Sequence, residues 1–193
     1  TAVTNEKAFT GGLSEETDEE LRQRILDSFQ RLPNGANAAW YELTACRHEG
    51  VAAAKAVGKA RGAGTVDVYV SAPDGIPSEK LLTELQTVFQ KSREIAVNVQ
   101  VKAPTAATVN VAVTVKTAKG TDFAKVKTAV EADLAEQFNG KLLSRGVKLA
   151  ELNSRIYALP GVENCHITAP AADLAANDTV LPVLGTVTVT EEA

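Results

Sequence analysis

Hydrophobic and polar residues recur along the chain with two periods, which predict helices and short strands. Apolar residues spaced by three and four positions predict helices at about 18–30, 37–46, 78–89, 121–138 and 149–159. Alternating apolar and polar residues, or short apolar runs, predict strands at 51–57, 65–70, 97–101, 109–115, 162–168 and 185–190. Helices and strands grouped in this way predict an α+β fold.

The start of the first helix is specified by capping residues. Thr17 is a favourable N-cap residue, and Glu20 three positions later completes a capping box. Asp18 and Glu19 place negative charge at the helix N-terminus, where the helix dipole favours it. The apolar stripe of this helix is predicted to consist of Leu21, Ile25, Phe29 and Leu32.

The second helix is predicted to begin at Asn37, another residue type that caps helices well. Its apolar pattern leads us to expect that Trp40 and Leu43 are buried. Because a single Trp at helical spacing from a Leu is more often core than a binding platform, we interpret Trp40 and Tyr41 as structural residues.

A weak internal repeat predicts two related modules. The pair Gly50-Val51 lies between a helix and a strand, and Gly161-Val162 has the same place in the second half of the chain. Pro104 interrupts the strand pattern between them. We therefore predict a first module at 1–103, which includes the N-terminal helical pair, and a second module at 104–193. Each is expected to pack helices on a small, mostly antiparallel sheet.

Composition excludes several classes of partner. The 193 residues carry a net charge of −4, and their 20 basic residues are scattered, which argues against a nucleic acid or an anionic membrane as partner. No apolar run approaches the roughly 20 residues of a membrane-spanning helix. The chain contains no Met, so we expect it to be a piece of a longer protein.

Every Cys and His of the chain falls in one of two short groups, Cys46 with His48 and Cys165 with His166, which are candidates for metal or thiol chemistry. They flank the two Gly-Val pairs, but structural zinc sites usually use closely spaced pairs, and adjacent Cys165 and His166 chelate poorly. We expect buried free thiols, no metal and no disulfide. A Cys-His nucleophile stays open as an alternative.

Two further patterns have simpler explanations than a ligand site. Gly62-Ala63-Gly64 resembles half of a phosphate-binding loop, but it lies between two predicted strands and lacks the third glycine, so we predict a hairpin loop. The acidic residues between Glu15 and Glu20 enter a helix and splay around its axis, so they cannot converge on one metal ion. The sequence therefore predicts no catalytic, cofactor-binding or metal-binding residue.

Several segments follow one another in a fixed order, namely 11–12 with 17–25, 35–38 with Tyr41, 50–55, 64–70, 158–162 and 184–189. Together they resemble the baseplate J-like family of contractile-tailed phages. The resemblance implies a wedge component that assembles around a central hub of the tail baseplate and connects it to outer parts near the tail fibres, in phages or in related injection machines such as tailocins. From the resemblance we also expect this sequence to be a fragment that lacks the family's N-terminal segment before Gly11. The resemblance implies no catalytic residues in this chain.

The resemblance sets the functional expectations. We expect a non-enzymatic subunit of a virion tail baseplate, assembled in the host cytoplasm with hub, wedge and fibre-attachment proteins. In isolation it should be a monomer or a weak oligomer, and the helix start at 15–20 and the sheet edges should serve assembly. The alternative is a small hydrolase or ligand-binding domain that uses Cys46 and His48 or the Gly62–Gly64 loop, which requires a pocket containing them.

Overall fold

The computed structural model describes residues 17–30 and 37–192, and it divides the chain into a unit up to Leu32 and a unit from Pro33 onward. The first unit contains helix α1 (Asp18–Gln30), as predicted. Leu21 and Ile25 of its predicted apolar stripe are exposed within this unit. Leu32, and the side chains of Phe29 and of Glu20 in the capping box, lie outside the described part. In the described ranges, no helix is both long and apolar enough to cross a membrane.

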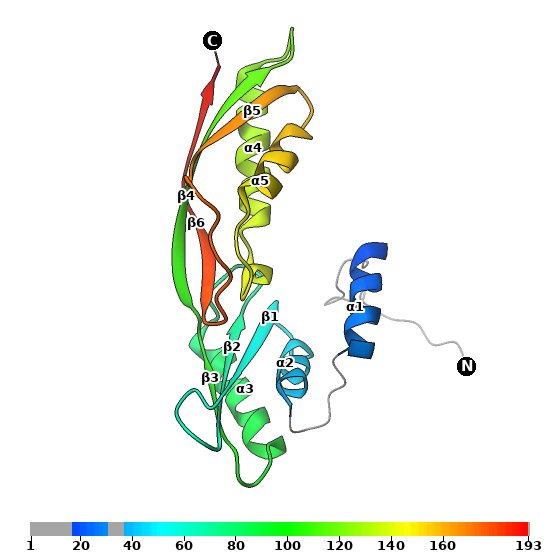
Figure 1. Cartoon of the computed structure of the whole chain (residues 1–193), viewed down its shortest axis with the longest axis vertical. Helices are drawn as coiled ribbons and strands as arrows, with labels where there is room; N and C mark the ends of the chain where they lie inside the picture. The colour runs from blue at the N-terminus through cyan, green and yellow to red at the C-terminus, as the bar shows by residue number, and fades with distance from the viewer. Residues whose placement is uncertain (1–16, 31–36, 193) are drawn as a thin grey trace, which may run out of the picture. The chain divides into compact units, whose positions relative to one another are not determined.

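The first module of the second unit is a three-stranded sheet with two helices (Figure 1). Its elements are α2 (Ala38–Cys46), β1 (Ala53–Gly58), β2 (Thr65–Ser71), α3 (Glu79–Ser92) and β3 (Asn98–Lys102). Strand β2 is central, pairing antiparallel with β1 and parallel with β3. Helix α3 makes the crossover connection that a parallel pair requires.

The helix starts of this module follow from their capping residues. The Asn37 side chain accepts a hydrogen bond from the Trp40 main-chain N, as predicted, and Ser78 does the same for Leu81. The expected burial of Leu43 is wrong, because its side chain is 41% exposed. Helix α2 turns Tyr41 and its i+4 neighbour Ala45 toward the sheet, which points Leu43 toward solvent.

Aromatic packing fixes α2 over the core of the first module. The Trp40 ring lies edge-on to Tyr41, with 4.8 Å between ring centroids, and is 6.2 Å from Phe89 of α3. Tyr41 and Phe89 are fully buried, whereas Trp40 is only partly buried. Trp40 therefore covers the edge of this core.

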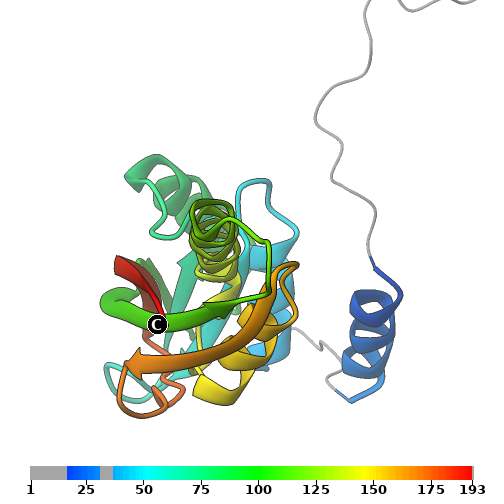
Figure 2. The same ribbon diagram turned by 90° about the horizontal axis from the view of Figure 1, so that it is seen from above.

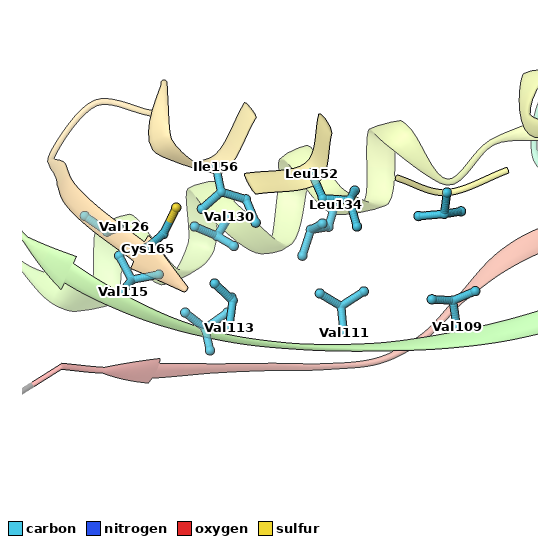
Figure 3. Packing of buried hydrophobic residues seen from close by; sticks show 12 residues of the cluster. Val109, Val111, Val113, Val115, Val126, Val130, Leu134, Leu152, Ile156 and Cys165 are labelled. Atoms are coloured by element: carbon cyan, nitrogen blue, oxygen red, sulfur yellow. The ribbon is translucent and has the colours of Figure 1, made fainter. Parts of the chain in front are cut away.

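The second module builds its core on one long strand, β4 (Thr105–Thr117). The other elements are α4 (Phe123–Gln137), a 3-10 turn η1 (Gly140–Leu142), α5 (Leu149–Tyr157), β5 (Val162–Ala169) and β6 (Val180–Glu191). Alternate residues of β4 point to one side, where they meet residues of α4 and α5 (Figure 3). These core residues are Val109, Val111, Val113, Val115, Val126, Val130, Leu134, Leu152 and Ile156.

Both sheets are mixed, whereas we expected mostly antiparallel sheets. In the second sheet β4 is central, antiparallel to β5 and parallel to β6 (Figures 1 and 2). The predicted repeat treats β5 and β6 as equivalents of the hairpin β1–β2, but β5 and β6 flank β4 and do not pair with each other. Alternation shows which face of a strand is buried and does not specify its neighbour. The α+β class in two modules is confirmed.

The two modules meet where η1 lies against the end of β2. The Ser71 hydroxyl donates a hydrogen bond of 2.6 Å to the carbonyl oxygen of Gly140. A Cβ atom on Gly140 would lie 1.9 Å from the Ala72 carbonyl oxygen, so only glycine allows this approach. Lys55 and Asp178 add an ion pair at 3.7 Å. The contact between the modules is thus specific and close-packed.

Candidate functional site

The candidate Cys165-His166 pair is divided between the two faces of β5. Cys165 is buried in the core, and His166 is exposed, because successive side chains of a strand point to opposite faces. Burial raises the pKa of the Cys165 thiol, and its Sγ lies 3.4 Å from Asn153 Oδ1. A buried, protonated thiol is a poor nucleophile and a poor metal ligand.

The other candidate pair, Cys46 and His48, lies at the C-terminal end of α2 in the first module. Cys46 is exposed, contrary to our expectation of a buried thiol, because it follows Ala45, which takes the buried position on α2. His48 Nδ1 is 2.9 Å from the Glu49 carbonyl oxygen.

The four candidate ligands are not brought together by the fold, since Cys46 and His48 belong to the first module and Cys165 and His166 to the second. Within residues 17–30 and 37–192, no group of three or more His, Cys, Asp and Glu side chains is arranged to hold a metal ion. The expectation that the protein binds no zinc stays a prediction, which elemental analysis of protein purified without chelators checks.

The Gly62–Gly64 segment connects the antiparallel strands β1 and β2. Thr65 Oγ1 donates to the Gly62 carbonyl oxygen at 2.7 Å and accepts from the Arg61 main-chain N at 3.1 Å. Gly64 has a φ of 74°, which glycine adopts easily. A phosphate-binding loop instead precedes a helix whose N-terminal N–H groups face the anion. The segment is therefore a hairpin loop, as predicted.

Asp67, beside this loop, is a buried carboxylate whose burial the sequence pattern does not predict. Because successive residues of β2 point to opposite faces, Asp67 is expected on the face away from Val66 and Val68, toward solvent. Its side chain is nevertheless only 2% exposed. Arg61 Nε and Lys102 Nζ lie 2.7 and 2.5 Å from its oxygens. Burial alone would raise the pKa of Asp67, and the hydrogen bonds and charges of Lys102 and Arg61 outweigh this and lower it.

This charged group is structural, because it ties the hairpin loop, β2 and β3 together. Its carboxylate is held by two cations. In the sequence, only the nearby Arg61 and the more distant Lys102 indicate that Asp67 could be paired and buried. The parallel pairing of β2 with β3 is what brings Lys102 to Asp67.

One small cavity lies in the second module. Its volume is about 190 Å³, and it is lined by Arg145, Leu174, Ala175, Asn177, Val180 and Pro182. Small-molecule sites are usually about 300–1,000 Å³ and carry several convergent polar groups. The cavity contains neither the candidate Cys and His residues nor the Gly62–Gly64 loop. It therefore gives no support to the hydrolase or ligand-binding alternative.

The outer face of the second sheet is an extended polar surface. Core residues of β4 point toward α4 and α5, so the residues between them point away from both helices (Figure 3). The exposed residues on this face are mostly hydroxyl or amide side chains and include Thr108, Asn110, Thr168, Thr186, Thr188 and Thr190. A broad surface of mostly hydroxyl and amide side chains suits contact with another protein better than catalysis.

Side chains cover main-chain groups on three of the four edge strands. Glu42 of α2 accepts a hydrogen bond of 3.2 Å from the main-chain N of Ala56 on β1. Gln86 of α3 bonds both Val99 O and Val101 N on β3, at 2.9 and 2.8 Å. On β5, the Asn164 side chain accepts from the Cys165 main-chain N at 2.9 Å.

Such cover limits the pairing of edge strands with other chains. The acidic residues Glu15 and Glu16, which we expected to serve assembly, lie outside the described residues.

Comparisons with known proteins match both modules to one family. Residues 33–103 match the model of the baseplate J-like central domain, and residues 109–190 match that of the baseplate J-like protein C-terminal domain. A search of curated proteins finds no match.

Among solved structures, the chain is similar to a chain in the cryo-EM structure of the anti-feeding prophage (AFP) baseplate, 6-fold symmetrised. The TM-score is 0.59 at 10% sequence identity, and the match covers 91% of this chain and 43% of that chain. At this identity the similarity concerns the fold, and the protein spans less than half the length of the chain it matches.

Proposed function

The chain belongs to the baseplate J-like family, and on that basis we propose that it is a structural wedge subunit of the tail baseplate of a phage or a related contractile injection system. The observation that carries the proposal is the succession of two adjacent domains of one baseplate family, at 33–103 and 109–190. The fold similarity to a chain of the anti-feeding prophage baseplate, which extends over both modules, supports it.

The protein acts through its surfaces and catalyses no reaction. This is supported by the separation of Cys46 and His48 from Cys165 and His166 in the fold, and by the use of Asp67 in ion pairs. Its partners are other baseplate and tail proteins, namely hub, wedge and fibre-attachment subunits. It assembles with them in the host cytoplasm and works in the tail baseplate, without nucleic acid or membrane as partner.

The two modules divide near Pro104, the first from residue 1 to 103 and the second from 104 to 193. The separate cores, one around Phe89 and one beneath β4, support this division, as do the ends of the two family-model matches. In isolation the protein is a monomer or associates weakly, because a wedge subunit obtains its geometry from several neighbours at once.

Deletion of the gene in the phage or tailocin producer tests the proposal. Particles from the deletion strain should lack baseplates or carry incomplete ones by electron microscopy, and the intact gene supplied in trans should restore them. Contractile tails with normal baseplates in the deletion strain would refute the proposal.

A further inference from the structure

The C-terminal half of β6 is an edge strand, and its outward main-chain groups have no bonding partner in the part of the chain that the structure describes. The Glu192 main-chain N donates to Val115 O on β4, and the Thr186 main-chain N donates to the Asn110 side chain on β4, both at 2.9 Å. Because the main-chain groups of alternate residues point to the same side of a strand, those of Thr188 and Thr190 also face β4. The groups of the intervening residues, Val187, Val189 and Glu191, face away from the sheet.

The N-terminal half of β6 is blocked to strand addition. Thr179 O accepts a hydrogen bond of 2.9 Å from Thr105 N, so the main-chain groups of Thr179 and of every second residue after it face β4. This alternation holds as far as a bulge, which lies between the pairs Val109–Leu184 and Val111–Val187. On this alternation Pro182 takes an outward position, where its missing N–H costs the sheet nothing and its ring obstructs a further strand.

The free segment is therefore short and bounded. In the described ranges, no side chain or loop bonds the main-chain groups of Val187, Val189 or Glu191 that face away from β4. The other three edge strands each have a side chain bonded to the main chain, from Glu42, Gln86 or Asn164. Exposed edges with strand-forming residues and no protection are templates for another strand.

We propose that residues 187–191 of β6 accept a β-strand from a different baseplate subunit, extending the second sheet by one strand. This inference rests on the proposed function and names the surface through which that function works. Main-chain hydrogen bonds would supply the affinity, as in other cases of strand addition. The polar face of the sheet beside it, with Thr188 and Thr190, would become part of the interface.

The charges along the edge indicate the chemistry of the incoming strand. The free segment ends in the exposed carboxylates of Glu191 and Glu192, and Lys116 on the neighbouring β4 is already paired with Glu163 at 2.6 Å. A β6 strand from a second copy would bring no basic residue, since residues 180–192 contain none. The lysines on its other edge strands, Lys55 on β1 and Lys102 on β3, are already paired with acidic residues of their own chain. The partner strand therefore carries a Lys or Arg opposite these glutamates and comes from a different polypeptide.

Amide hydrogen exchange, resolved to single residues, tests the proposal on the purified protein and on baseplate-bearing particles. The amides of Val187 and Val189 should exchange fast in the purified protein and about 100-fold more slowly in particles, as new hydrogen bonds protect them. The amides of Thr188 and Thr190, bonded to β4, should be slow in both samples and serve as internal controls.

Three other outcomes would overturn the proposal. Unchanged exchange in particles that contain the protein would refute strand addition and leave the proposed function standing. Absence of the protein from the particles would refute both. Slow exchange in the purified protein that depends on its concentration would assign the edge to a second copy of this chain.

A pair of variants at Glu191 separates the main-chain bond from the charge. Glu191→Pro removes one outward N–H and obstructs an incoming strand, so its incorporation into particles should fall about tenfold or more. Glu191→Ala keeps the N–H and should be incorporated several times better than the Pro variant. Both purified variants should melt within a few degrees of the parent protein. Equal incorporation of the two variants would contradict the proposal.

Discussion

At the scale of single residues, Asp67 shows how a polar side chain is accommodated in the first module. Its carboxylate is buried and its partners Arg61 and Lys102 are partly exposed, so the cations can rehydrate if the carboxylate is removed, whereas a buried carboxylate without them could not be solvated. Asp67 is therefore the member of the group on which the fold depends most.

Asp67→Asn should lower the free energy of unfolding at pH 7 by about 2–3 kcal/mol, which is less than the roughly 3–5 kcal/mol for breaking a fully buried ion pair, because both cations reach water. The exposed Asp74→Asn is the matched control and should change stability little. Urea unfolding of the three proteins measures the difference. A variant at Asp67 as stable as the Asp74 control would contradict the structural role of the ion pairs.

The same group predicts the response to acid. Because the pKa of Asp67 is lower in the folded protein than in the unfolded chain, its contribution is complete above the unfolded pKa, near 4, and is lost as the pH falls through the folded pKa. Between pH 5 and pH 2.5 the parent protein should lose more stability than Asp67→Asn. Parallel curves for the two proteins would contradict this assignment.

Gly140 has a comparable role at the junction of the modules, where a Cβ atom would meet the Ala72 carbonyl oxygen. Gly140→Ala should cost about 1–3 kcal/mol, as overpacking of a tight contact does, and should increase hydrogen exchange around Ser71. Gly58→Ala is the control, because nothing lies within 4 Å of its Cβ position. Equal stability of the two variants would show that η1 does not pack closely on β2.

At the scale of elements, the sequence pattern predicts each helix close to its place in the structure. The capping residue Asn37 predicts the start of α2 and accepts the expected main-chain hydrogen bond, and Ser78 and Asp122 cap α3 and α4 in the same way. Lys148, before α5, makes no such side-chain bond. The strands are predicted as elements but not as neighbours, because pairing depends on long-range contacts. β6 begins at Val180, whereas the sequence pattern predicted a strand only from residue 185. The pattern missed the first residues because Pro182 argues against a strand except at an edge position.

The candidate site shows the same division between local and long-range information. The hairpin at Gly62–Gly64 could be predicted, because turn residues act locally. The burial of Asp67 and the cover of β3 by Gln86 could not, since each needs the parallel placement of β3 beside β2. Cys46 differs from its prediction by a single position on α2, within the usual uncertainty of assigning the buried face of a short helix.

Packing of α2 on the first core gives a prediction for this element. Phe89→Ala should cost about 3–5 kcal/mol, as for a fully buried aromatic ring. Trp40→Ala should cost less, because Trp40 is only partly buried and covers the edge of the core. Ile95→Ala, at a fully exposed position, should be near neutral in the same thermal or urea unfolding series. If Trp40→Ala lowers the free energy of unfolding more than Phe89→Ala does, Trp40 lies at the centre of this core and this interpretation is wrong.

At the scale of the whole molecule, the two modules pack closely where Ser71 meets Gly140, and each keeps its own sheet and core. Such a body can present several separate surfaces in a fixed relation, including the polar face of the second sheet and the free edge of β6. This arrangement suits a subunit that contacts different neighbours at once.

A cryo-EM map of particles from the producing strain tests the central claim most directly. The account predicts density in the baseplate that accepts both sheets of residues 37–192, with the β6 edge next to density from a different subunit. A baseplate map in which every wedge position is filled by other chains, with this protein absent from the particles, would contradict it.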